Sequence, residues 1–485
     1  MASHGVSSDT LEFRVRGRRA QGPYRAVPRN DAAENERKIR RVPKSRRPLP
    51  LKRRSRPTKA GGYKGSGDEP VKFFGYERTD GVGPKDPAKN AVDMSGADSE
   101  SGVVLMSGNW FVRYSTNAGG SFSTVDPTTV FPKWTDHDFC CDQIVIYVPS
   151  IDRFVWFMQH EADAAGVGAF RLAVGSPAAI KKDFQSAWTY WNFTAKDFGL
   201  SEDLDYPDLS YTKQFLHIST DATTTNGRFV VRVALADVRA GGSLPGRHTH
   251  PDKSKSAVGA HLIQGSLDGA FWVGAPDNSN LEVFSWPDSG TGYSWYTAAV
   301  AAYPNAALSS KGPNGKDWLK WLSAHVPGFH VCGGVRVGDV LWLAWTASSG
   351  SGTSGGPTFP NAHVRIATID ISAKAVTSEQ QVWNSGYAFA YPSLNVNSQG
   401  EIGIAVGVGG TNNNAHSSFG IIGDHVVWHV DEGDTTPARW GDYLTVRGNQ
   451  RNGNHFAGFG YYTTKDPNDA SQYDAHPFYL VFGRP

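Results

Sequence analysis

The feature that most constrains this chain is a unit of two short strands that recurs along it. Each unit has a polar or aromatic residue, a short strand, a turn and a more apolar strand, as in YPDLSYT followed by QFLHIST within 206–220. The units begin near Asn90, Asp142, Tyr206, His261, His330, Tyr391 and Trp440. Because one such unit cannot bury its own apolar face, repeated units are expected to stack into one continuous core.

The composition agrees with many short strands joined by tight turns. Gly accounts for 54 of 485 residues, and charged residues for only 19%. No long stretch shows the apolar period of a helix, and strand-like runs such as QIVIYV at 143–148 recur instead. A propeller blade of four strands needs roughly 40–50 residues, and longer spacings leave room for loops. We therefore predict an all-β fold, a β-propeller of seven blades, with six as the alternative count.

The N-terminal region has a different charge from the rest of the chain. Residues 1–64 hold 19 Lys and Arg against five acids, a charge of +14. A segment so charged and so poor in large apolar residues is predicted to be disordered. The predicted organisation is a disordered basic arm at 1–64, a linker at 65–88 and a propeller domain at 89–485. The arm could bind an anionic partner, although no aromatic residue interleaves its basic run.

Several function classes lack their sequence signatures here. No apolar run approaches the ~20 residues of a membrane span, and no secretory leader is recognised, so the compartment is left open. The chain has no Walker loop, dinucleotide fingerprint, HExxH or GxSxG. The cysteines are Cys140, Cys141 and Cys332, and this odd number argues against a disulfide framework. Two reduced thiols at 140 and 141 are expected, with a vicinal disulfide as the alternative, and the protein is expected to be a monomer.

The clearest local motif is STNAGGSF at 115–122. Ser115, Asn117, Gly119 and Phe122 have the spacing S-x-[DN]-x-G-x-x-[WF]. This resembles the Asp-box of the sialidase superfamily, with Asn in place of the usual Asp. The resemblance implies a structural hairpin between the outer two strands of a blade, in which the polar side chain caps the turn.

A second resemblance covers more of the chain. The segments at 206–220, 391–411 and 438–463 resemble blades of uncharacterised sialidase-fold proteins. The resemblance implies a propeller that binds or processes glycans, often at a cell surface or outside the cell. The F-R-I-P-type arginine motif of true sialidases is absent, so no arginine triad is assigned.

A propeller would bring the starts of its innermost strands together at one end of a central channel. The residues at these starts are polar or aromatic: Asp136, Asp138, Asp142, Tyr206, Asp208, His261, His330, Tyr391, Arg439, Trp440 and Asp442. Such groups can stack a sugar ring, hydrogen-bond its hydroxyls or hold a carboxylate. The competing interpretation is that they cap turns and fasten neighbouring blades.

Three functions follow from this arrangement. The first is recognition of a glycan or small polar ligand, with Tyr206, Asp208, His261, His330, Tyr391 and Trp440 as binding residues. The second is glycoside hydrolysis, with Asp138, Asp142, Asp442 and Arg439 as catalytic residues, so whether the protein is an enzyme is left open. The third is a protein-interaction platform tethered by the basic arm. No cofactor is predicted, apart from a weak Ca²⁺ candidate at Asp136, Asp138 and Asp142.

Overall fold

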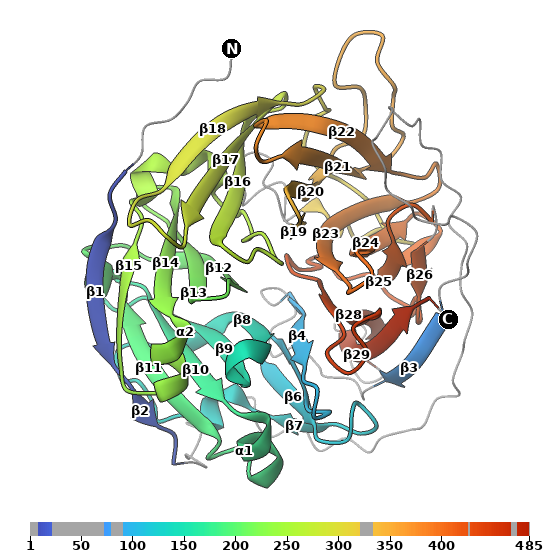
Figure 1. Ribbon diagram of the computed structural model, residues 1–485. Helices are drawn as coiled ribbons and strands as arrows, with labels where there is room; N and C mark the ends of the chain where they lie inside the picture. The colour runs from blue at the N-terminus through green and yellow to red at the C-terminus, as the bar shows by residue number, and fades with distance from the viewer. Residues whose placement is uncertain are drawn as a thin grey trace.

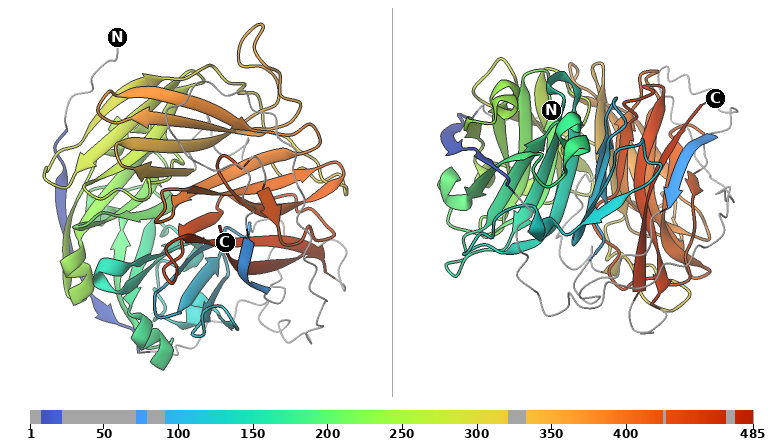
Figure 2. Two further views of the ribbon diagram at one scale, coloured as in Figure 1. Left: turned by 45° about the vertical axis from the view of Figure 1, so that its right-hand side comes forward. Right: turned by 90° about the horizontal axis from the view of Figure 1, so that it is seen from below.

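Small antiparallel sheets surround one central axis (Figure 1). This computed structural model describes residues 8–21, 72–78, 91–320, 333–424, 427–466 and 473–484. Seen from below, the strands of the different sheets run in broadly the same direction, as in a short cylinder (Figure 2). The all-β prediction is confirmed.

The first four blades follow one another along the chain. Blade 1 contains β4 (Ser95–Asp98), β5 (Val104–Gly108), β6 (Phe111–Ser115) and β7 (Ser123–Val125). Blade 2 contains β8 (Phe139–Val148), β9 (Arg153–His160), β10 (Ala169–Gly175) and β11 (Trp188–Thr194). Blade 3 contains β12 (Leu204–Tyr211), β13 (Phe215–Ala222), β14 (Gly227–Ala234) and β15 (Ser243–His248). Blade 4 contains β16 (Gly269–Asp277), β17 (Asn280–Pro287) and β18 (Ser294–Ala299), with Leu262 paired to Trp272 on its inner side.

The remaining blades complete the ring. Blade 5 contains β19 (Gly333–Val337), β20 (Val340–Ala347), β21 (His363–Asp370) and β22 (Ala375–Val382). Blade 6 contains β23 (Ala388–Val396), β24 (Ile402–Gly410), β25 (Asn413–Ile421) and β26 (Val427–His429). Blade 7 contains β27 (Thr445–Gly448), β28 (His455–Lys465) and β29 (Tyr473–Gly483). The one strand pairing between blades 6 and 7 in the described residues is that of His416 with Tyr462, so the preferred count of seven blades is confirmed there.

Short helical turns lie in the connections between strands. They are α1 (Pro177–Lys182), α2 (Leu235–Ala240), η1 (Pro127–Thr129), η2 (Pro149–Ile151), η3 (Ala195–Phe198), η4 (Pro251–Lys253) and η5 (Lys255–Ala257). No helix in the described ranges is long and apolar enough to cross a membrane.

The ring is closed by a strand from the N-terminal side of the propeller. Strand β3 (Lys72–Arg78) pairs with β29 at the outer edge of blade 7, beside which it is seen in Figure 1. Blade 1 follows β3 in the sequence, and it also binds blade 7. Thr445 of blade 7 donates a hydrogen bond to the Met94 carbonyl at 3.0 Å, and Asn449 donates one to Asp98 at 2.6 Å. The predicted linker at 65–88 therefore contains a blade strand, and its other residues lie outside the described ranges.

The prediction of a wholly disordered arm is wrong for residues 8–21. Strand β1 (Leu11–Arg16) pairs with β15, and β2 (Arg18–Arg19) pairs with β11, so this segment runs along the outer edges of blades 3 and 2. An exposed edge strand presents unpaired N–H and C=O groups, and these edges accept a further strand. Phe13 anchors the segment because its ring packs 5.2 Å from that of Phe198. The basic run at 37–59 lies outside the described residues.

Aromatic side chains fill the spaces between blades. Among the described residues the fully buried tryptophans are Trp156, Trp188, Trp191, Trp272, Trp286, Trp318, Trp345 and Trp440. Trp156 and Trp188 meet edge to face at 5.2 Å, in a cluster that joins blade 2 to blade 1 residues such as Leu105 and Val112. Burying each large apolar side chain contributes about 1.5–3 kcal/mol. The apolar side chains of the described residues form six clusters, each of which spans neighbouring blades, in place of the one continuous core that the repeat predicted.

The hairpin predicted at 115–122 joins β6 to β7, the outer strands of blade 1. Ser121 N donates to Asn117 Oδ1 at 3.0 Å, and Gly119 N donates to Ser115 Oγ at 2.9 Å. Gly119 has a φ of +87°, which Gly adopts without strain. The Phe122 ring lies 6.3 Å from Tyr479 of blade 7. These contacts are those of a structural turn, and its identification as an Asp-box stays a prediction.

Candidate functional site

The innermost strands of three blades begin with an unusual backbone conformation. Asp93, Tyr206 and Tyr391 have φ values of 50°, 53° and 54°. In β12 and β23 these residues lie in register shifts, between Asp205 and Asp208 and between Ala390 and Ser393. A left-handed backbone is a costly exception for a bulky residue such as Tyr. The repeated Tyr-Pro dipeptide therefore forms a bulge within the innermost strands of blades 3 and 6.

Four aspartates gather at this end of the axis, and we call them the acidic cluster: Asp93, Asp142, Asp205 and Asp442. They come from the starts of blades 1, 2, 3 and 7, which are neighbours in the ring. Each of Asp93, Asp205 and Asp442 acts electrostatically on Asp142. Segments more than three hundred residues apart in sequence thus supply one site.

Polar neighbours hold two members of the acidic cluster in place. Asn109 donates to Asp93 Oδ2 at 2.6 Å, and the N–H of Tyr443 donates to Asp93 Oδ1 at 3.2 Å. Gln159 Nε2 donates to Asp205 Oδ1 at 3.1 Å and to the carbonyl of Leu204 at 3.0 Å. These contacts fix the carboxyl groups at the ends of the cluster.

The charge balance of the acidic cluster favours protonated carboxyl groups. Burial raises the pKa of Asp142 well above its ordinary value, and the charges of Asp93, Asp205 and Asp442 raise it further, against the opposing charge of Arg439. Burial and the charge of Asp93 raise the pKa of Asp442 to about 7. Near neutral pH the cluster therefore offers protonated carboxyl groups, which donate hydrogen bonds, beside ionised ones, which accept them.

Two tyrosines lie beside the acidic cluster. Burial raises the pKa of Tyr206, and the charges of Asp442 and Asp205 raise it further, so its phenol stays protonated. The same holds for Tyr443, on which Asp142 acts most strongly after burial. The buried hydroxyl of Tyr443 has no hydrogen-bond partner among the described residues. Such a hydroxyl is a donor and acceptor available to a ligand.

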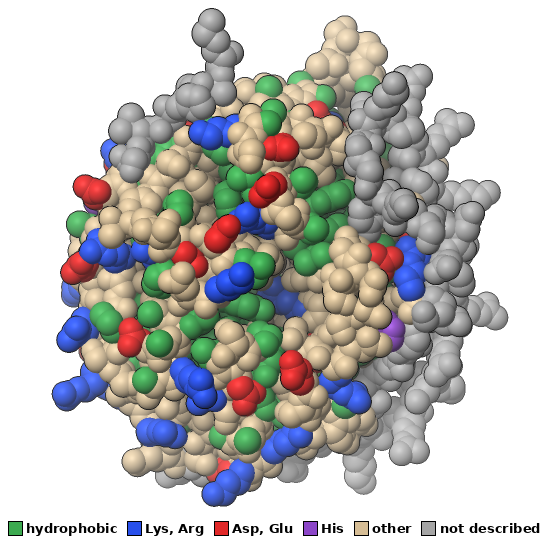
Figure 3. Space-filling model, viewed as in Figure 1, with side chains coloured by type: hydrophobic (Ala, Val, Ile, Leu, Met, Phe, Trp, Pro, Cys, Tyr) green, Lys and Arg blue, Asp and Glu red, His purple; other side chains and the backbone are tan. Residues whose placement is uncertain are grey.

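A second polar region lies in a hollow along the channel, and we call it the Asp208 pocket. Its cavity volume is about 30 Å³, and the empty space reaches about 360 Å³ only when the open solvent at its mouth is included. It is lined by Ser95, Ile144, Asp208, His261, Leu262, Gln264, Gly333, Gly334, Ser393, Leu394, Tyr443, Leu444, Thr445 and Arg447. Figure 3 shows the face of the molecule hollowed near the axis, with a basic side chain inside the hollow.

The negative charge of Asp208 is balanced by neighbouring groups within this pocket. Its Oδ2 accepts the N–H of Leu262 at 2.7 Å and lies 3.5 Å from Nδ1 of His261. Burial pushes the pKa of Asp208 up, but the hydrogen bond and charge of His261, together with the charge of Arg447, hold it below its ordinary value. Tyr443 links the two regions, because its ring lies 5.0 Å from His261 and 6.2 Å from Tyr206.

Several predicted site residues do meet near the axis. Asp142, Asp442 and Tyr206 lie in or beside the acidic cluster, where Arg439 acts electrostatically on Asp142 and Asp442. Asp208 and His261 line the Asp208 pocket. Tyr391 is buried against Trp318, with ring centroids 6.1 Å apart, although it still acts electrostatically on Tyr206.

Other predicted positions differ from the expectation. Trp440 is buried, stacked on Tyr461 at 4.1 Å, and cannot present its face to a ligand. Asp138 is exposed and lies 3.6 Å from Lys133, so it supplies no buried carboxyl for an acid-base pair. His330 lies outside the described residues.

The Ca²⁺ candidate at Asp136, Asp138 and Asp142 is not assembled. Asp136 and Asp138 are exposed, whereas Asp142 interacts electrostatically with the other members of the acidic cluster. No group of three His, Cys, Asp or Glu side chains in the described part of the chain could hold a metal ion. The prediction fails because the loop separates residues that are close in sequence.

Sequence reasoning missed Asp93, Asp205, Tyr443 and Arg447. Asp93 lies in the first repeat unit, NAVDMS, three residues after its predicted start at Asn90, so the predicted boundary hid that it shares the left-handed backbone of Tyr206. Asp205 and Tyr443 each adjoin a residue that was predicted, Tyr206 and Asp442 respectively. Arg447 carries no sequence signal, because it lies inside an ordinary strand.

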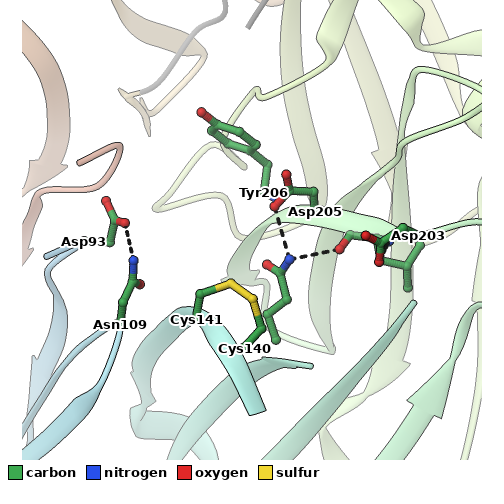
Figure 4. The surroundings of a disulfide bond; sticks show 9 residues. Asp93, Asn109, Cys140, Cys141, Asp203, Asp205 and Tyr206 are labelled. Atoms are coloured by element: carbon green, nitrogen blue, oxygen red, sulfur yellow. Dashed lines mark hydrogen bonds between the residues drawn. A yellow bond between two sulfur atoms is a disulfide. The ribbon is translucent and has the colours of Figure 1, made fainter. Parts of the chain in front are cut away.

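The expectation of two reduced thiols is also wrong. Cys140 and Cys141 form a disulfide between adjacent residues. Figure 4 shows this bond between the Asp93 and Asn109 pair on one side and Asp205 on the other. The covalent bond therefore borders the acidic cluster.

Comparison with known proteins shows likeness at the level of fold only. No family model matches the chain, and no curated protein matches it by sequence. A chain in the crystal structure of the Mitotic Checkpoint Complex has a TM-score of 0.40 and 14% identity, covering 88% of this chain and 99% of that one. A GH93 α-L-arabinofuranosidase of Fusarium graminearum has a TM-score of 0.38 and 10% identity, covering 83% and 97%. A fungal alcohol oxidase of the AA5 family, in complex with copper, has a TM-score of 0.43 and 13% identity, covering 83% and 76%.

Proposed function

We propose that the protein recognises a glycan or another small hydroxyl-rich ligand at the end of its central channel. The observation that carries this proposal is the acidic cluster, to which four neighbouring blades each contribute one carboxyl group. Gathering like charges in a buried place opposes folding. Side chains that destabilise the fold in this way are typical of functional sites.

The chemistry of the site suits hydroxyl groups. A sugar hydroxyl both donates and accepts, and the cluster offers carboxylates that accept beside protonated carboxyls that donate. Asp442, with a pKa of about 7, can do either near neutral pH. The unpartnered hydroxyl of Tyr443 adds a further contact between the cluster and the Asp208 pocket.

Binding is tested by comparing matched variants on a glycan array and then by calorimetry with any sugar that binds. Asp142→Asn and Asp442→Asn are expected to weaken binding at least about tenfold, the value of one lost charge-assisted hydrogen bond. Asp138→Asn is the control, since this carboxyl is exposed and lies outside the cluster. Equal binding by all three variants, or no glycan bound by the unaltered chain, would refute the proposal.

Glycoside hydrolysis is the second candidate, favoured by one observation. Asp442 has a raised pKa beside the other carboxyls of the acidic cluster, and glycosidases pair a protonated carboxyl with an ionised one. In this reaction Asp442 would protonate the leaving oxygen, and a carboxyl of the acidic cluster that is ionised at the working pH would act as base or nucleophile. A panel of aryl glycosides tests it: turnover that falls at least about a hundredfold in Asp442→Asn supports hydrolysis, and an inactive unaltered chain excludes it for that panel.

A further inference from the structure

The disulfide between Cys140 and Cys141 lies in a segment that the sheet does not hold. Phe139 pairs with His160 and Gln143 pairs with Met158, so β8 advances four residues where β9 advances two. The extra residues, within Cys140–Cys141–Asp142, form a bulge at the inner end of blade 2. Bulged residues lack ladder partners, and their conformation must be held by something else.

We propose that this disulfide is a reducible site, opened in the folded protein by a small dithiol, and that opening it frees the segment that carries Asp142. A bond between adjacent cysteines closes a small ring that contains the peptide unit joining them. The ring limits rotation about the backbone next to Asp142. No second disulfide among the described residues constrains the bulge.

Both ends of the bulge are anchored, so a local opening is compatible with an intact blade. On one side Gln143 donates to the Phe111 carbonyl at 3.1 Å and accepts from Trp156 Nε1 at 2.9 Å. On the other side the N–H of Glu161 donates to the Asp138 carbonyl at 2.8 Å. Reduction therefore changes the segment between these anchors while blades on either side keep their pairing.

The bond is placed where a reductant can reach it. Cys140 and Cys141 are both partly exposed, unlike the buried residues Ile144–Val148 that follow in β8. In Figure 4 the sulfur atoms lie at the border of the acidic cluster, between side chains from blades 1 and 3. Because both cysteines are partly exposed, a small dithiol in solution can reach them.

The reaction is ordinary thiol–disulfide exchange. A thiolate of the dithiol attacks one cysteine sulfur, the S–S bond breaks, and the other cysteine leaves as a thiolate that takes up a proton. The second thiol of the reagent, as its thiolate, then attacks the reagent's other sulfur in the mixed disulfide, and the cysteine bonded to that sulfur leaves as a thiolate that takes up a proton. The products are two cysteine thiols and a cyclic oxidised dithiol, so the cysteines gain the two electrons that the reagent loses.

The consequence concerns the position of Asp142. Its carboxyl group shares the acidic cluster with Asp93, Asp205 and Asp442, and the backbone that carries it follows directly on the disulfide ring. Once the ring is open, the backbone at 140–142 can turn this carboxyl away from its neighbours. The cluster then loses one member without loss of the fold.

The experiment uses the full chain and dithiothreitol under native conditions. Alkylation and peptide mapping first establish that Cys140 and Cys141 are oxidised before treatment and become alkylated after it. Amide hydrogen exchange then measures the bulge. We expect exchange within 139–143 to accelerate at least about tenfold on reduction, while exchange in β9 and β10 stays unchanged.

Two variants separate the bond from general effects of the reagent. The double variant Cys140→Ser, Cys141→Ser should show fast amide hydrogen exchange in the bulge without reductant, and added reductant should not change that rate. Cys332→Ser retains the pair and should behave as the unaltered chain. Thiols that are already alkylated before treatment, a bond that resists dithiothreitol until the protein unfolds, or unchanged exchange after reduction would each overturn the proposal.

The outcome is independent of the function proposed above. If a glycan binds, its affinity should fall about tenfold on reduction and return on reoxidation, and an affinity that does not change would overturn the predicted displacement of Asp142. If no glycan binds in either state, the proposed function fails, while exchange and alkylation still decide the redox inference.

Discussion

The acidic cluster and the Asp208 pocket treat buried carboxyl groups in opposite ways. Asp208 has His261, the N–H of Leu262 and the charge of Arg447 around it, and its pKa is lowered. Asp442 lies among other aspartates with Arg439 as the opposing charge, and its pKa is raised to about 7. Both carboxyls are buried, so burial does not explain the difference. The arrangement of neighbouring charges does.

This difference distinguishes a carboxylate whose contacts stabilise the fold from a carboxyl group whose neighbours destabilise it. A paired carboxylate fastens blade 3 to blade 4, because Asp208 and Leu262 belong to those blades. The acidic cluster brings carboxyls from four blades together at a cost in folding free energy. Removing the carboxylate of Asp208 should therefore lower the free energy of unfolding, whereas removing a carboxyl group of the acidic cluster should raise it.

The largest expected effect is that of Asp208→Ala. Removing one partner of a buried charged pair typically costs about 3–5 kcal/mol of unfolding free energy, and here it also leaves the N–H of Leu262 unpaired. Urea unfolding at pH 7 measures this loss. A change below about 1 kcal/mol would mean that Asp208 is not a structural anchor.

Asp442→Asn should change how stability depends on pH. The folded pKa of Asp442 is about 7 against an ordinary 3.8, so between these values the folded state binds more protons than the unfolded state. Stability from this group is present at low pH and lost as pH rises through about 7, at up to about 1.4 kcal/mol per pH unit. The variant should lack this slope and be the more stable protein at pH 8.

The measurement is urea unfolding of both proteins from pH 5 to pH 8. Buried histidines such as His217, whose pKa burial lowers to about 3, give stability the opposite dependence on pH. Both proteins contain these histidines, so subtracting one stability curve from the other cancels their contribution. Parallel curves for the two proteins would show that the pKa of Asp442 is not raised in the folded protein.

His261→Ala tests what lowers the pKa of Asp208. The hydrogen bond and charge of His261 are the strongest of the influences that oppose burial, so the pKa of Asp208 should rise in the variant. Because His261 is partly exposed, the loss of unfolding free energy should be about 1 kcal/mol. Carboxyl chemical shifts across a pH titration check the first expectation, and a pKa that stays low would assign the effect to Arg447.

Asp138→Asn should have the smallest effect. Asp138 and Lys133 are both about half exposed and lie 3.6 Å apart, and such surface pairs contribute less than about 0.5 kcal/mol. Thermal unfolding of the variant should coincide with that of the unaltered chain. A marked shift would show that the acidic cluster extends farther toward the surface than its four members.

The fold was largely predictable because its signals are local and repeated. Alternating strands, turn residues and the recurrence of one unit predicted seven blades, and the predicted starts at Tyr206 and Tyr391 coincide with bulges in the innermost strands of two blades. The strands at 8–21 were not predictable from composition. Their basic residues alternate with apolar ones such as Phe13 and Val15, and pairing with open blade edges outweighs the charge.

The site was predictable only in part, for a physical reason. The sequence by itself determined which residue types stand at the strand starts, since those positions follow from the period of the repeat. Only the tertiary structure decided which of these side chains face the axis, so that Asp142 and Asp442 meet Asp93 and Asp205 while Trp440 turns into the core. The tertiary structure also decided which carboxyl groups have their charge balanced, because the balancing groups are remote in sequence. It decided that Cys140 and Cys141 are joined, because that bond depends on the geometry of the backbone.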